Sequence, residues 1–163
     1  EPDGKIKERT LAVKEVLEKM NGGQVNVVDN AIGCVWSKLI VNAAINAPAT
    51  LLRLRNGDLP GSTEGKELIH SIVSECMMVV QANNIRLVMD DPEKHVIEVC
   101  LGTASNLNSM FQDILAGRKT EIDFMNGAIS RRAQAFGLPA PVNQTLSLMI
   151  KVLEKSAGLT VLV

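Results

Sequence analysis

Aromatic residues are almost absent from this chain. Its 163 residues include one Trp, three Phe and no Tyr, so aromatics make up 2% of the sequence. This argues against nucleic-acid surfaces that stack bases on aromatic rings. Net charge is also nearly absent, at −1 with a pI near 6.2, so attraction to phosphate backbones or anionic membranes should not dominate binding. We therefore expect neither nucleic acid nor a membrane as a partner.

Cysteine is scarce and widely spaced. The three residues Cys34, Cys76 and Cys100 form no C-x-x-C pair, so we expect neither a disulfide framework nor a metal site. No charged-then-apolar leader opens the sequence, and no stretch of 18 uncharged apolar residues follows. These features predict a reducing, cytoplasmic location.

The N-terminal segment predicts a helix and a strand that lack a partner. Apolar residues recur at helical spacing over residues 6–20, and Gly22 should end that helix. The alternation over residues 24–29 predicts a short strand, which cannot satisfy its hydrogen bonds alone. Because the sequence also starts without Met, we expect residues 1–29 to be the remnant of an absent domain.

Residues 30–163 predict an all-α, orthogonally packed multi-helix bundle. Pro48 should kink or restart the first helix, and a loop is expected over residues 56–61. Thr120 and Asp123 resemble a capping box. The helices are expected over residues 31–47, 63–83, 92–104, 110–116, 121–136 and 141–156.

A thin polar stripe runs along the first of these helices. Lys38, Asn42 and Asn46 are spaced by four, which places successive residues about 40° apart around a helix. Nearly every other residue from 35 to 47 is apolar, so the helix should be buried on most sides. Either the Lys side chain snorkels at an edge, or it serves as a cationic acid between two amides, which requires a cleft.

Other polar candidates have ordinary structural explanations. Asn106 and Ser109 lie in a turn, where Asn and Ser commonly cap helices. Glu121 would favour the dipole of the helix that it begins. The segment 61–66 is one residue short of a phosphate loop, and no G-x-G-x-x-G is present. The main site of any dinucleotide cofactor should therefore lie elsewhere.

Two segments together resemble ketopantoate reductase (2-dehydropantoate 2-reductase). They are residues 36–46 followed by Asn56-Gly57-Asp58-Leu59, and residues 106–127, with further agreement at Gly137 and residues 141–143. The resemblance implies a helical C-terminal domain, of the 6-phosphogluconate dehydrogenase C-terminal-like type, that closes on an N-terminal Rossmann domain holding NADPH. It implies reduction of a 2-oxo acid, 2-dehydropantoate, to (R)-pantoate in pantothenate and coenzyme A biosynthesis.

The resemblance also implies roles for individual residues. Lys38 would be the general acid, and Glu121 would reach toward the cofactor and that Lys. The implied substrate ligands are Asn42, Asn46, Asn56 and Ser109, with Asn106 a lesser candidate. One departure is Ala47-Pro48, because many members have Pro directly after the second Asn of the stripe.

Two alternatives stay open at this point. The chain is either a catalytic half or a non-catalytic helical dimerisation module, and a homodimer is possible in both cases. A related reductase would keep the chemistry and act on another branched 2-oxo acid.

Overall fold

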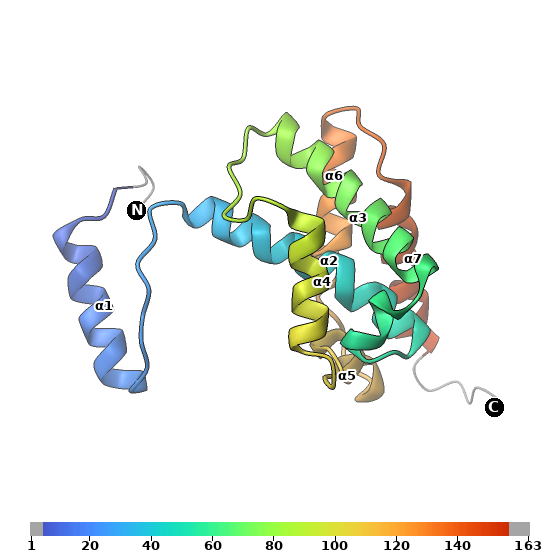
Figure 1. Ribbon diagram of the computed structural model, residues 1–163, viewed down its shortest axis with the longest axis horizontal. Coiled ribbons are helices and arrows are strands. Elements are labelled where there is room, and N and C mark those ends of the chain that lie inside the picture. The colour runs from blue at the N-terminus through green and yellow to red at the C-terminus, as the bar shows by residue number, and fades with distance from the viewer. Residues whose placement is uncertain (1–4, 157–163) are drawn as a thin grey trace.

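The computed structural model describes residues 5–156, and every regular element within that range is a helix (Figure 1). The expected domain limits also include residues 1–4 and 157–163, which lie outside the described residues. The elements, in chain order, are α1 (Glu8–Asn21), α2 (Ala31–Leu52), η1 (Asn56–Gly61), α3 (Thr63–Ala82), α4 (Pro92–Gly102), α5 (Ser109–Leu115), η2 (Ile122–Phe124), α6 (Asn126–Ala135) and α7 (Pro141–Ser156). The all-α prediction is confirmed.

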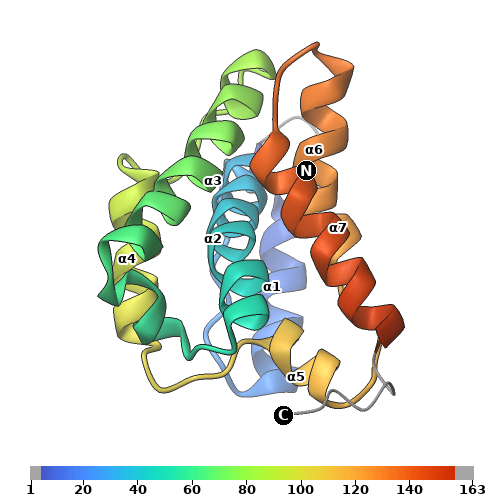
Figure 2. The same ribbon diagram turned by 90° about the vertical axis from the view of Figure 1, so that its right-hand side faces the viewer.

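Helix α2 is the centre of the bundle. It contacts α3, α4, α5 and α7, and Figure 2 shows it between the α3/α4 side and the α6/α7 side, with α5 at one end. Ala43, Ala44 and Ala47 are fully buried, and their small side chains let neighbouring helices approach closely. The core therefore forms around the helix that carries the polar stripe.

Several helix ends follow directly from side-chain chemistry. The Ser62 hydroxyl accepts a hydrogen bond from the Gly65 amide at 3.0 Å at the start of α3. The Asp91 carboxylate does the same for the Lys94 amide at the start of α4, also at 3.0 Å. Gly22 ends α1 in the left-handed conformation, at φ 62°. These starts and stops were predicted correctly.

The strand predicted over residues 24–29 is not formed. No strand occurs between residues 5 and 156, and this segment is irregular. The Val25 amide instead donates to the Glu18 carboxylate at 3.1 Å. The prediction was wrong for this chain because a strand needs a second strand for its hydrogen bonds, and residues 5–156 supply none.

Two further expectations about helix limits were wrong. Helix α2 continues through Pro48 to Leu52, and the expected loop over residues 56–61 is the 3-10 helix η1. The predicted helix over residues 121–136 is two pieces, because Met125 adopts φ −108° and ψ −108° and separates η2 from α6. Thr120 caps no long helix, and its hydroxyl donates to the Glu154 carboxylate at 2.6 Å.

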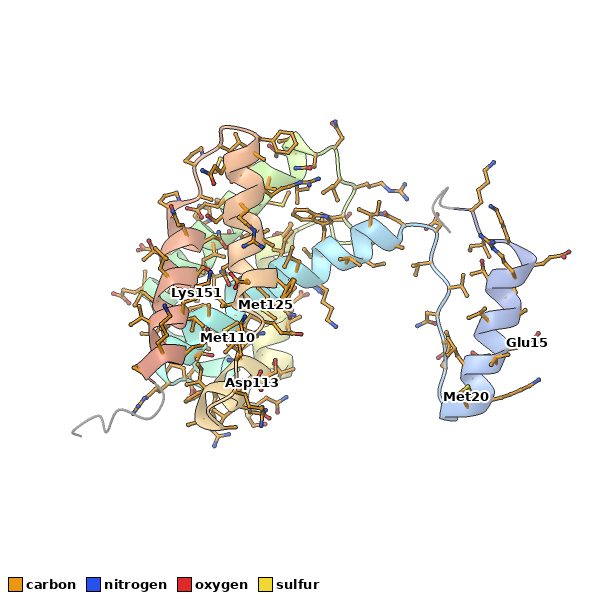
Figure 3. The ribbon with its side chains drawn as sticks, turned by 180° about the vertical axis from the view of Figure 1, so that it is seen from behind. Glu15, Met20, Met110, Asp113, Met125 and Lys151 are labelled. Carbon is orange, nitrogen blue, oxygen red and sulfur yellow. The ribbon has the colours of Figure 1, made fainter. Side chains whose placement is uncertain are left out.

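Helix α1 stands apart from the other helices (Figures 1 and 3). Its apolar residues are consequently exposed: Leu11 at 48%, Val13 at 57%, Val16 at 55% and Met20 at 75%. An apolar face of this kind normally packs on another element.

Within the described part of the chain, no helix combines the length and the apolar character needed to cross a membrane.

Candidate active site

The polar stripe on α2 runs from solvent into the core. Lys38 is exposed, Asn42 is half-buried, and Asn46 is buried with 7% of its surface exposed. The first turns of α2 project from the bundle, whereas its later turns are enclosed by it (Figure 1). The stripe therefore presents a cation at its outer end and amides further in.

Lys38 forms no hydrogen bond or ion pair with any residue between 5 and 156. The cleft expected around it is not closed by these residues, because the side chain is exposed. A shallow hollow on the same helix is lined by Trp36 and Leu39 of α2 and by Arg131 of α6, among others. A wall over Lys38 would have to come from another part of the protein or another molecule.

Asn46 connects the stripe to the junction between η2 and α6. Its Nδ2 lies 3.8 Å from the Met125 sulfur, which accepts this weak hydrogen bond in a buried position. Glu121 precedes η2 in the same segment and is exposed. Its carboxylate is not paired with Lys38 among the described residues. The structure thus brings α2 into contact with the junction between η2 and α6, but it forms no ion pair between Lys38 and Glu121.

Asn56 and Asn106 are brought together at η1. The backbone amide of Asn56 donates to the backbone carbonyl of Asn106 at 3.0 Å. The side-chain Nδ2 of Asn56 donates to the Thr103 hydroxyl, also at 3.0 Å. Asn56 is buried, and its Oδ1 has no hydrogen-bond partner among the described residues. The Asn106 side chain is exposed. An orphaned buried acceptor of this kind costs free energy unless a donor is supplied.

Ser109 begins α5 and is exposed, and the residue before it fixes its place. Asn108 Oδ1 accepts from the Phe111 amide at 3.0 Å and from the Thr50 hydroxyl at 3.2 Å. Thr50 lies on α2 one turn beyond Asn46. Ser109 is thereby held near the inner end of the stripe.

Sequence reasoning missed three polar residues of this region, namely Thr50, Thr103 and Asn108. Thr50 carried a usable signal, because it continues the four-residue spacing of Lys38, Asn42 and Asn46. Asn108 carried only the local signal of a helix cap, through the Phe111 amide three residues on. The contacts of Asn108 to Thr50 and of Thr103 to Asn56 carried none, since these partners are 58 and 47 residues away in sequence.

The described residues do not suit a dinucleotide or a metal ion. They contain no strand that leads through a glycine-rich turn into a helix, which is the usual cradle of a pyrophosphate. No group of three or more His, Cys, Asp or Glu side chains among residues 5–156 is arranged to hold a metal. Glu121, which the resemblance implies as a cofactor contact, lies exposed immediately before η2.

Comparisons with known proteins agree with the helical arrangement. Residues 30–154 match the family described as ketopantoate reductase PanE/ApbA C terminal. A 2-dehydropantoate 2-reductase from Pyrobaculum aerophilum is 39% identical over 145 residues, which cover 89% of this chain and 50% of that protein. The structure of a PanE/ApbA family ketopantoate reductase from Ralstonia eutropha superposes with a TM-score of 0.86 at 28% identity, covering 93% of this chain and 50% of that one.

A second solved structure is of a dehydrogenase with another name. D-mandelate dehydrogenase, in a ternary structure with NADH and anilino(oxo)acetate, superposes with a TM-score of 0.80 at 26% identity over 94% of this chain and 52% of that one. Fold and relatives together define a helical domain of an oxidoreductase family. The chain belongs to the ketopantoate reductase C-terminal family, and it spans about half the length of the relatives that it matches.

Proposed function

We propose that this chain is the substrate-binding half of an NADP-dependent reductase that converts 2-dehydropantoate to (R)-pantoate. The observation that carries the proposal is the stripe on α2, which presents an exposed, unpaired ammonium group at Lys38 beside the amides of Asn42 and Asn46. Family membership supports the same function, because the relatives from Pyrobaculum and Pyrococcus carry the name 2-dehydropantoate 2-reductase.

Lys38 would act as the general acid. A reduced nicotinamide, when bound, supplies the hydride to the ketone carbon of the 2-oxo acid. The carbonyl oxygen then takes the electron pair of the broken π bond, and the Lys38 ammonium group donates the proton that makes it a hydroxyl. The positive charge of Lys38 stabilises the same oxygen while its negative charge develops.

The amide and hydroxyl side chains would orient the acid. Asn42, Asn46 and Ser109 both donate and accept hydrogen bonds, so they can hold carboxylate and hydroxyl groups without adding charge. Asn56 has a free acceptor at Oδ1, which suits a substrate hydroxyl, with Asn106 beside it. Glu121 would contact the cofactor from the helical side.

An N-terminal Rossmann domain would complete the enzyme. Residues 1–29 would belong to that domain and residues 30–163 to the helical one. The exposed apolar face of α1 and the unpaired segment after Gly22 support this division, because both need a packing partner. The twofold greater length of the relatives supports it as well.

The test is kinetic and uses the longer protein, with the cofactor domain that we propose precedes this chain. Lys38→Ala should lower kcat for 2-dehydropantoate reduction by about 100-fold or more, as loss of a general acid does. Lys94→Ala is the matched control, since Lys94 is exposed on α4, and it should stay within about twofold of wild type. A loss of only a few-fold at Lys38 would remove it from the acid role.

A second substrate is favoured by one specific observation, the likeness to D-mandelate dehydrogenase with NADH. The chemistry would be the same with an aromatic 2-oxo acid and the unphosphorylated cofactor. The test measures kcat/KM for 2-dehydropantoate and for the 2-oxo acid whose reduction would give mandelate, each with NADPH and with NADH. The substrate and cofactor with the higher kcat/KM are those of this protein.

A non-catalytic dimerisation module is the remaining alternative. Trp36 is half-buried and lies two residues before Lys38, so its fluorescence reports on the stripe. Titration of this chain with pantoate should change that fluorescence saturably if the stripe binds substrate. Dimers in sedimentation experiments, together with no fluorescence change and no activity of the longer protein, would favour the module.

A further inference from the structure

Two asparagines that sequence reasoning gave no role are completely buried. Asn126 of α6 and Asn143 of α7 are both 0% exposed. Asn126 Nδ2 donates to the Ala43 carbonyl of α2 and to Asn143 Oδ1, at 3.0 Å each. Asn143 Nδ2 in turn donates to the Glu75 carboxylate of α3 at 2.7 Å. This buried polar chain, Glu75–Asn143–Asn126–Ala43, joins four helices.

Glu75 anchors the far end of the buried polar chain. Its carboxylate is 6% exposed and accepts the backbone amides of Val142 and Asn143, at 2.8 and 2.9 Å. These amides lie in the first turn of α7, where unpaired donors and the helix dipole favour a negative charge. Charge-assisted bonds of this kind are short and directional, so they fix where the Asn143 side chain lies.

The other end of the buried polar chain is the Ala43 carbonyl, which lies on α2 within the segment that carries the polar stripe. Ala43 follows Asn42 directly and precedes Asn46 by three residues. The residue before Asn126 is Met125, which is labelled in Figure 3. Its sulfur accepts a hydrogen bond from Asn46 Nδ2. Because Met125 also ends η2, the segment that carries Glu121 is attached to the stripe at the same place.

We propose that Asn126 is a positioning residue that holds α2 and the Glu121 segment in register, so that Asn42 and Asn46 face the substrate while Glu121 faces the cofactor. The proposal rests on the proposed function, because it takes the stripe as the substrate site. Asn126 Oδ1 is buried without a partner among the described residues, which costs free energy. An apolar side chain would avoid that cost but would not fix the direction of the contact to Ala43.

The first test is spectroscopic and needs no activity. In nitrogen-15 NMR spectra of this chain, the side-chain amides of Asn42 and Asn46 should shift in Asn126→Leu, and again in Asn126→Ala if the Leu variant does not fold. Asn83→Ala is the matched control, because Asn83 Oδ1 holds Arg132 of the same helix α6 at 2.8 Å, away from the junction. This control should leave both signals in place.

The second test separates positioning from stability. In the longer protein, the folded Asn126 variant should lower kcat for the 2-oxo acid by about tenfold or more and raise KM for the cofactor, because both the stripe and Glu121 lose their positions. Asn83→Ala should change neither value by more than about twofold. Circular dichroism at the assay temperature shows that each variant is folded.

The outcomes distinguish the two proposals. If the wild-type protein reduces no 2-oxo acid, the proposed function fails, and the NMR comparison still decides the role of Asn126. If the Asn42 and Asn46 signals stay in place in both Asn126 variants, the positioning role is overturned whatever the activity. A kcat within twofold of an active wild type overturns it as well.

Discussion

The hydroxyl of Thr50 donates to Asn108 Oδ1 at 3.2 Å, which joins the inner turns of α2 to the start of α5. Both side chains are buried, at 1% and 7% exposure. The same oxygen accepts the Phe111 amide at 3.0 Å, so one atom both caps α5 and holds it against α2. The position of Ser109 therefore depends on a contact between two residues far apart in the chain.

Removing the Thr50 hydroxyl should loosen this junction. In Thr50→Val the shape of the side chain is kept and the donor is lost, so the free energy of unfolding should fall by about 1 kcal/mol. Urea unfolding followed by circular dichroism measures the change.

Thr145→Val is the matched control for Thr50→Val. Thr145 is exposed on α7, and the same replacement there should stay within about 0.5 kcal/mol of wild type. Equal losses at the two positions would show that the buried contact to Asn108 contributes nothing.

The helices were predictable because each carries its own signals. Ser62 and Asp91 cap α3 and α4 through amides three residues away, and such contacts can be inferred from local sequence. The break at Met125 carries no glycine or proline signal, and the next residue, Asn126, bonds to Ala43, which lies 83 residues away, so local sequence did not predict it. The strand over residues 24–29 was mispredicted for the same reason, since strand formation depends on a partner.

The stripe on α2 was predictable from spacing alone, and its environment was not. Four-residue spacing places Lys38, Asn42 and Asn46 on one face, as an α-helix requires. The gradient from exposed Lys38 to buried Asn46 depends on how far the other helices extend along α2. The buried polar chain through Asn126 could not be inferred, because each of its contacts joins different elements.

A methyl group at Gly65 should be poorly tolerated. A Cβ there would lie 1.8 Å from the Leu59 carbonyl oxygen, which is backbone and cannot move aside as a flexible side chain does. Gly65→Ala should therefore lower the free energy of unfolding by about 1–3 kcal/mol, the usual cost of overpacking.

Gly102→Ala is the contrasting variant. Nothing lies within 4 Å of a Cβ at Gly102, which is the last residue of α4. Because Ala favours a helix over Gly, this replacement should be neutral or stabilise by up to about 1 kcal/mol. Thermal unfolding of both variants checks the pair, and a Gly65→Ala protein as stable as Gly102→Ala would contradict the close approach of Leu59.

The three thiols should differ in reactivity. Burial raises the pKa of Cys76 to about 12 and that of Cys100 to about 11, whereas Cys34 is half-buried. Because the thiolate is the reacting species, iodoacetamide at pH 8 should label Cys34 at least about tenfold faster than the other two. Mass spectrometry of the peptides measures this, and unfolding in guanidinium should make all three react alike. Rapid labelling of Cys76 in the folded protein would contradict its burial.

Asp123 should make stability depend on pH. Lys151 Nζ lies 2.5 Å from Asp123 Oδ1, and this hydrogen bond, helped by the charges of Lys151, Arg131 and Lys119, lowers the pKa of the carboxyl group. The folded state then binds fewer protons than the unfolded state. The stabilisation is therefore present above the unfolded pKa, about 3.9, and is lost as the pH falls through the lower folded value.

Asp123→Asn should accordingly lower the melting temperature at pH 7 and not at a pH where the carboxyl is protonated. The side chain of Asp123 is 34% exposed, so solvent screening limits the effect to about 1 kcal/mol, or a few degrees. Lys151→Met should reduce the same pH dependence, because it removes the main cause of the lowered pKa. Calorimetry of the three proteins from pH 7 down to pH 2 tests the sign. A difference between wild type and Asp123→Asn that stays constant over this range would show that the carboxylate charge is not what stabilises the fold.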